Sequence, residues 1–282
     1  MADNVEFCYH CISAGIMESI KKQIKRFPES ISFLQTVSWV MGQMSHLRDS
    51  PSFKETAWDL FPALKTIPLK TFLFLQVIKD VAPHLTSPIL ELQTACLHFF
   101  GNCVSGTDEI TQQIINCGVL KHLHKFLNHL NLNLQEETAW MLSNILAGTK
   151  DQITAVFAAD LMPSIIGLTE SDEISVTEKA VWAIANVPLC GTLQHINLLL
   201  DLNIIPSLCK LLLLCPKKEI IQSVLEAING IQRQSCDRRE EIRQKMLAAG
   251  VIDHLRQLCN HESDAIESNA MQLLNDLFND SI

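Results

Sequence analysis

The sequence of 282 residues predicts an all-α solenoid. Two different sequence markers recur along it with one period of about 42 residues, a typical length for a helical repeat. Between the markers, apolar residues recur at steps of three and four, as on one face of a helix, and no segment shows the strict alternation of a half-buried strand. Only 6% of the residues are aromatic, which disfavours all-β folds because their strands draw on aromatic and β-branched side chains.

The first marker is a helical segment that ends in Asn and, in two copies, carries Trp four residues earlier. Trp140 and Asn144 form one copy, and Trp182 and Asn186 form the next, one period later (182 − 140). We call these four residues the Trp/Asn ladder. Asn102 lies one period before Asn144 (144 − 102), and a fourth, weaker copy over 224–231 ends near Gly230.

The second marker is a short turn flanked by apolar residues. It recurs after about one period each time, at Gly118, Asp160, Asn203 and Gly250. Gly, Asn and Asp best tolerate the left-handed backbone that a sharp turn between helices demands. The last step is the longest and contains the polar run 234–241, which predicts a lengthened surface loop.

Each regular unit is therefore predicted to hold a first helix, the turn, a second helix and a third helix that ends near the Asn. Apolar spacing supports a second helix after Gly118 and another after Asn203. Repeats of about 40–47 residues with two or three helices are the armadillo and HEAT class. Stacking of such units buries one continuous core.

We predict a single solenoid over residues 1–282, with an irregular N-terminal part. Gln43 stands in the Asn position of an early copy, and the step from Gln43 to Asn102 (102 − 43) is neither one period nor two. Three segments result. Residues 12–47 form a degenerate repeat, residues 48–87 an irregular or partly deleted repeat, and residues 88–282 the regular repeats.

Composition and charge exclude several function classes. The net charge of −9 argues against a nucleic-acid binder and fits a basic partner. Ten dispersed cysteines, without a secretion signal or a long uninterrupted apolar run, predict free thiols in the cytoplasm and nucleus and no membrane partner. Cys8, His10 and Cys11 have no second ligand pair, so we predict no metal site. Without a phosphate-binding Gly loop or a nucleophile elbow, we predict no enzyme, no catalytic residue and no cofactor.

The chemistry of the Trp/Asn ladder favours an extended peptide as ligand. Residues four apart share one helix face, so each Trp projects with its Asn. An Asn amide can pair with the N–H and C=O of a peptide main chain. Neighbouring indoles form slots for Lys or Arg stems, with cation–π attraction to the charged head. The alternative interpretation is structural: each Trp is core, and each Asn holds the next repeat in place.

Three runs resemble importin α in order and spacing, over residues 101–109, 137–148 and 180–186. They are similar to that family's sixth, seventh and eighth armadillo repeats; residues 224–282 resemble its last two, and residues 12–64 its fourth. The resemblance implies a right-handed armadillo superhelix and a nuclear import adaptor for Lys/Arg-rich nuclear localisation signal cargo. It also implies a nuclear exporter as a candidate partner of the C-terminal repeats.

The resemblance also implies the binding residues. The smaller of the family's two peptide sites would be formed by Asn102, Val104, Asp108, Thr111, Glu137, Trp140, Ser143, Asn144, Trp182 and Asn186. Trp39 would be the last remaining tryptophan of the larger site.

Some positions depart from the family pattern. The N-terminal region up to Ser30 holds four cations, where the family has a dense Arg/Lys segment that binds importin β: Lys21, Lys22, Lys25 and Arg26. We therefore expect a truncated or diverged member that does not recruit importin β by itself. His98 replaces an Arg, and Lys179 replaces a Glu three residues before Trp182, where it is expected to repel an incoming cation.

Two rival functions stay open from the sequence. The chain could be an armadillo scaffold or regulatory protein that binds another partner on a different surface. It could also be a subunit that depends on a partner, because a broken N-terminal repeat exposes an apolar end.

Overall fold

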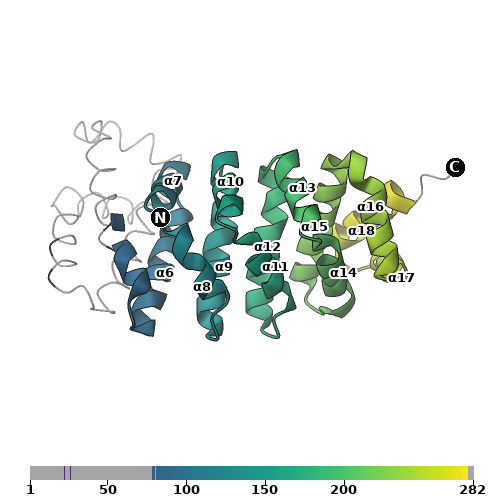
Figure 1. Ribbon diagram of the computed structural model, residues 1–282. Coiled ribbons are helices and arrows are strands. Elements are labelled where there is room, and N and C mark those ends of the chain that lie inside the picture. Colours follow the sequence, from purple (N-terminus) through teal and green to yellow (C-terminus); the bar gives the residue numbers. More distant parts are fainter. Residues whose placement is uncertain (1–21, 23–25, 27–77, 80, 279–282) are drawn as a thin grey trace, which may run out of the picture. The chain divides into compact units, whose positions relative to one another are not determined.

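The computed structural model describes residues 22, 26, 78, 79 and 81–278 (Figure 1). Within these described residues all the regular secondary structure is helical, which confirms the all-α prediction. The predictions for Trp39, for Gln43 and for the repeat over 12–47 lie outside the described residues, as does most of the segment 48–87.

The chain divides into two compact units, residues 1–126 and 127–282. In the first unit, the described helices are η3 (Ala82–Thr86), α6 (Leu90–Val104), α7 (Asp108–Asn116) and α8 (Leu120–Leu127), the last ending one residue past the boundary. The second unit begins with α9 (Leu132–Leu146).

Three complete repeats follow α9, each with a first, a second and a third helix. The first repeat holds α10 (Lys150–Ala158), α11 (Met162–Gly167) with η4 (Leu168–Glu170), and α12 (Ile174–Cys190). The second holds α13 (Leu193–Asp201), α14 (Ile204–Leu214) and α15 (Lys218–Gln234). The third holds η5 (Cys236–Arg238) with α16 (Arg239–Ala248), α17 (Ile252–Leu258) and α18 (Asp264–Phe278). The predicted three-helix unit is confirmed.

The turn between the first and second helix of each repeat has a left-handed backbone. The φ angles are 77° at Gly118, 54° at Asp160, 58° at Asn203 and 70° at Gly250. These are the four turn residues that the sequence predicted. A β-branched or bulky residue would be strained at such an angle, which explains why Gly, Asp and Asn recur here.

Third helices form the packed layer of the second unit. Helix α12 packs between α9 and α15, and α15 packs against α18 (Figure 1). The contact faces are apolar and fully buried, as at Leu142, Ile184 and Ile228. Burying each such side chain contributes about 1.5–3 kcal/mol relative to leaving it exposed. This layer carries the Trp/Asn ladder.

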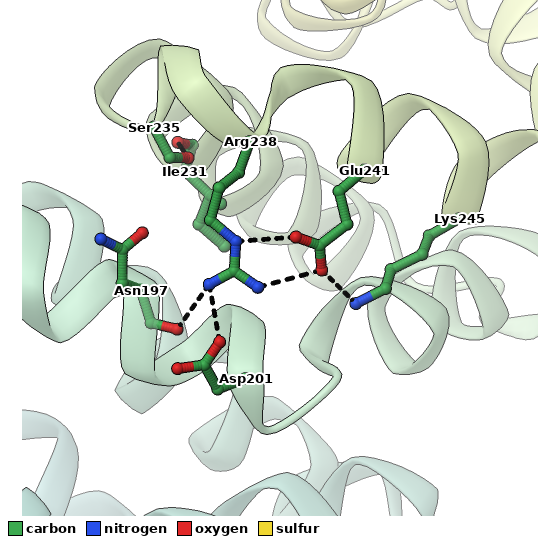
Figure 2. A network of polar contacts seen from close by, with 7 residues as sticks. All are labelled: Asn197, Asp201, Ile231, Ser235, Arg238, Glu241 and Lys245. Atoms are coloured by element: carbon green, nitrogen blue, oxygen red, sulfur yellow. Dashed lines mark hydrogen bonds and ion pairs between the residues drawn. The ribbon is translucent and has the colours of Figure 1, made fainter.

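Residues 234–241 do not form the lengthened loop that the sequence predicted. Helix α15 runs to Gln234, and η5 leads directly into α16. Arg238 accounts for the difference (Figure 2). Its guanidinium donates to the Asn197 carbonyl at 3.1 Å, to Asp201 at 2.7 Å and to both oxygens of Glu241, at 2.7 and 3.1 Å. A planar guanidinium favours such paired contacts, so the extra residues are fixed against α13.

Gly230 supplies a stability prediction, because it lies where α15 meets Pro188 of α12. A Cβ atom at Gly230 would lie 2.8 Å from the Pro188 Cβ, a distance that forces the rigid ring or the helix to move. We expect Gly230→Ala to lower the free energy of unfolding by about 1–3 kcal/mol, despite the better helix propensity of Ala.

Urea denaturation measures this change, and Gly167→Ala in α11 is the matched control, since nothing lies within 4 Å of its added Cβ. We expect the control to be neutral or stabilising. Equal stability of the two variants would contradict the close packing at Pro188.

His195 supplies a pH prediction. Its ring is buried at the start of α13, where Nδ1 accepts from the Thr192 N–H at 3.1 Å and Nε2 lies 2.9 Å from Thr154 Oγ1. Burial lowers the pKa of His195 below its ordinary value of 6.5. The unfolded chain therefore binds this proton more readily, and the stability that neutral His195 contributes is lost as the pH falls below about 6.5.

His195→Gln should abolish this dependence. Gln152 holds the equivalent capping position in α10, where its oxygen accepts from the Thr149 N–H at 3.0 Å, so a glutamine keeps the cap and does not titrate. We expect wild type to lose stability relative to His195→Gln between pH 7.5 and 5.5 in thermal or urea denaturation. Parallel pH profiles of the two proteins would contradict it.

Candidate functional site

The Trp/Asn ladder lies on two adjacent, packed third helices. Trp140 and Asn144 on α9 take the same helical positions as Trp182 and Asn186 on α12. All four side chains are half-buried, neither fully enclosed in the core nor fully exposed. Each indole is therefore partly packed and partly exposed.

Asn186 also links the two helices. Its Nδ2 donates to the carbonyl of Ser143 on α9 at 2.9 Å, across one repeat. This contact supports the structural interpretation of the repeated Asn for this residue. The Nδ2 atom of Asn144 is buried without a hydrogen-bond partner among the described residues.

Three predicted site residues are buried and serve the local backbone. Ser143 Oγ donates to the carbonyl of Trp140 at 2.8 Å. In the first unit, Thr111 Oγ1 donates to the carbonyls of Val104 and Thr107, at 3.3 and 3.2 Å. Ser143, Val104 and Thr111 therefore present little side-chain surface to a ligand.

The predicted site residues are divided between the two units. Asn102 and Asp108 belong to the first, where Asn102 is half-buried on α6 and Asp108 is exposed at the first residue of α7. A carboxylate at that position is stabilised by the helix N-terminus. Glu137 belongs to the second unit, half-buried on α9 one turn before Trp140.

The two tryptophans have different charged neighbours. On α9, the two residues one turn before Trp140 are acids, and one of them, Glu136, accepts from Ser175 Oγ of α12 at 2.8 Å. On α12, the corresponding positions hold an acid and a lysine, Glu178 and Lys179. The Lys179 Nζ lies over the Trp182 ring, 3.7 Å from its centroid.

Glu178 connects this pair to the next repeat. Its Oε1 lies 3.9 Å from Lys179 Nζ, and its Oε2 accepts from Lys217, immediately before α15. This hydrogen bond raises the pKa of the Lys217 ammonium. From the sequence, Lys179 was expected to repel a cation, and its stacking on Trp182 was not predicted. The three-residue spacing was the signal that could have shown it.

The described residues offer little else for chemistry. Within them, no group of three or more His, Cys, Asp or Glu side chains is placed to hold a metal ion. Burial raises the pKa of Cys96 and of Cys209 to about 12, and burial also raises the pKa of Cys103. These thiols are therefore protonated and poor nucleophiles.

A search for membrane spans covered the same part of the chain. No single helix there is both long and apolar enough to cross a membrane. Two helix pairs reach the required length and hydropathy only when counted together, across bends of 85° and 75°: Lys150–Ala158 with Met162–Glu170, and Leu193–Asp201 with Ile204–Leu214.

Comparison with known sequences gives one family and one group of relatives. Residues 107–147 match the armadillo/beta-catenin-like repeat family. The chain is 35% identical over 105 residues to importin subunit alpha-5 of Arabidopsis thaliana, covering 37% of this chain and 19% of the relative. It is 32% identical over 154 residues to importin subunit alpha-4 of the same plant, covering 50% and 28%. For importin subunit alpha-1a of Oryza sativa subsp. japonica, the identity is 27% over 169 residues, covering 51% and 32%.

Solved structures establish the fold. The chain superposes with a TM-score of 0.73 on a designed armadillo repeat protein in complex with the peptide (KR)4, at 22% identity, covering 92% of this chain and 98% of the other. A computationally designed armadillo repeat protein for modular peptide recognition gives 0.74 at 21% identity, covering 92% and 98%. The chain therefore has the armadillo-repeat fold and is similar in sequence to importin α subunits over part of its length, and its matches span less than a third of these relatives.

The Asn186 contact generates a stability prediction. Asn186→Ala removes the donor to the Ser143 carbonyl, and Asn186→Asp places a carboxylate oxygen against that carbonyl. We expect the Ala variant to lose about 1 kcal/mol of unfolding free energy and the Asp variant about 1–3 kcal/mol, by urea denaturation. The control is Asn133→Ala, at an exposed asparagine of α9, with a change within about 0.5 kcal/mol. If the Asn186 variants lose no more unfolding free energy than the control, the hydrogen bond from Asn186 to Ser143 does not stabilise the packing of α9 and α12.

Proposed function

We propose that the Trp/Asn ladder lines a groove for extended Lys/Arg-rich peptides and that the protein is an adaptor for cargo carrying nuclear localisation signals. One observation carries the proposal: half-buried Trp and Asn occur in the same register on two packed helices, α9 and α12. A single Trp on a helix is commonly core. A repeated pair at matching positions gives a peptide equivalent contacts at regular intervals.

The spacing of the helices suits an extended chain. Packed helices lie about 8–10 Å apart, and an extended peptide rises about 3.3 Å per residue, so about three peptide residues pass each repeat. Lys and Arg stems would lie along an indole of the Trp/Asn ladder whose face is open to the ligand. Asn186 uses its donor inside the protein, so its amide oxygen is the atom that would accept a peptide N–H.

Charge and likeness support the same ligand. The protein carries a net charge of −9, and Glu136 and Glu137 precede Trp140 by one turn. The sequence relatives are importin α subunits, and one designed armadillo protein of this fold was solved with the peptide (KR)4. We therefore propose that the protein acts in the cytoplasm and nucleus. Coupling to importin β and recognition by an exporter are separate predictions.

A scaffold that binds its partner elsewhere is the second candidate. The hydrogen bond from Asn186 to the Ser143 carbonyl favours it, because this amide already has a structural role between α9 and α12. Exposed leucines offer other surfaces on the second unit, with Leu189 69% and Leu214 72% exposed. The two candidates differ in whether basic peptide binding depends on the ladder.

Peptide binding is the test. The peptide (KR)4 should bind with micromolar affinity, about −7 to −9 kcal/mol, and more weakly as salt rises. Trp140→Ala combined with Trp182→Ala should remove most of this affinity while helical circular dichroism stays native. Fluorescence anisotropy of a labelled peptide measures the affinity of the wild type and of the double variant.

Two controls make the result specific. An acidic peptide, (ED)4, should not bind, and Leu214→Ala should bind (KR)4 like wild type, since Leu214 ends α14, outside the layer of third helices. Unchanged affinity in the folded Trp double variant would refute the groove and leave the scaffold.

A further inference from the structure

The indole of Trp182 already has a cation on its face. Lys179 lies one helical turn before Trp182, and its Nζ is 3.7 Å from the ring centroid. This is within the range of a strong cation–π contact, for which distances up to about 6 Å count. The Lys179 side chain is only 20% exposed, so the contact is partly shielded from water and strengthened by it.

A neighbouring carboxylate holds this lysine in place. Glu178 is 13% exposed and lies between two ammonium groups, with Lys179 at 3.9 Å and Lys217 hydrogen-bonded to its other oxygen. One carboxylate with two ammoniums leaves a local charge of +1. The attraction that Glu178 could offer to a ligand cation is therefore used within the protein.

The equivalent position on α9 has the opposite charge. Two acids, Glu136 and Glu137, stand one turn before Trp140, where α12 has Glu178 and Lys179. The change of sign takes place over one repeat, on helices that pack against each other. Two slots built on the same Trp/Asn frame therefore differ in the side chain they would accept.

We propose that Lys179 is a built-in occupant of the cation slot at Trp182, so that the groove accepts Lys or Arg at the Trp140 repeat and rejects it at the Trp182 repeat. This inference rests on the proposed peptide-binding function and defines its specificity. A peptide cation arriving at Trp182 must displace Lys179 from the ring or remain beside a positive charge. Either route weakens binding at that slot.

The inference defines the class of peptide. Adjacent repeats correspond to about three extended residues. The preferred ligand is a peptide with a short basic cluster at the Trp140 repeat. About three positions along the peptide, at the Trp182 repeat, it carries a neutral or acidic residue. An acidic side chain there would pair with Lys179, which could stay on the ring.

Removing the occupant should open the slot. With (KR)4 as the probe, whose cations reach both slots, Lys179→Ala should tighten binding about fivefold at low salt, equivalent to about 1 kcal/mol. Lys179→Glu restores the arrangement at Trp140 and should tighten it about tenfold or more. Lys210→Ala removes the same charge from α14, where Lys210 is 53% exposed beside Glu170, and should change affinity less than twofold.

A double-mutant cycle separates occupation of the slot from long-range charge. In wild type, Trp182→Ala should cost (KR)4 less than twofold, because its ring is already covered. In the Lys179→Ala background, the same change should remove the fivefold gain. Equal costs in the two backgrounds would overturn the inference.

The stack itself can be observed without any peptide. Selectively ¹³C-labelled lysine should give strongly upfield side-chain signals from Lys179, shifted by the indole ring and absent in Trp182→Ala and in Lys179→Ala. Absence of such signals in wild type would overturn the inference.

The binding data also separate this inference from the proposed function. If Trp140→Ala weakens (KR)4 binding while Lys179→Ala leaves it unchanged, the inference fails and the peptide-binding function stands. If (KR)4 binds none of these proteins, both fail.

Discussion

The packing of third helices against one another is the constraint on which the second unit depends. A single repeat cannot enclose its own apolar face, so α12 buries residues such as Ile184 and Val187 in the layer that it forms with α9 and α15. At about 1.5–3 kcal/mol for each large apolar side chain, this burial outweighs any single polar contact in the layer. Its register then decides which polar residues meet.

Polar contacts between repeats follow from that register. Asn186 reaches the Ser143 carbonyl across 43 residues, Ser175 reaches Glu136 across 39, and Gln232 reaches Asp276 across 44. Each contact spans about one period, because each third helix packs against the third helix of the next repeat. The same geometry repeats the Trp/Asn positions, so structural links and candidate ligand contacts use the same positions. Asn186 illustrates this, with its donor used inside the protein.

The proposed binding function and the stability of the layer therefore depend on the same side chains. Lys179 covers the ring of Trp182, and its neighbour Glu178 also binds Lys217, at the start of α15. A residue that covers a binding surface thus belongs to the network that joins two repeats. Changes at such positions are therefore expected to affect both ligand affinity and folding.

The sequence by itself determined the helical class, the repeat length and the turn positions, because these depend on local chemistry. Gly118, Asp160, Asn203 and Gly250 had to tolerate a left-handed backbone, and all four have it. It misjudged residues 234–241, since two of the contacts that fix Arg238 come from Asn197 and Asp201 of α13, one repeat earlier in the chain. It predicted Trp140 and Trp182 as site residues, but only the tertiary structure showed that Lys179 stacks on Trp182 and that Asn186 binds the Ser143 carbonyl. Side-chain conformations depend on neighbours from the adjacent repeat, and a linear pattern does not specify those contacts.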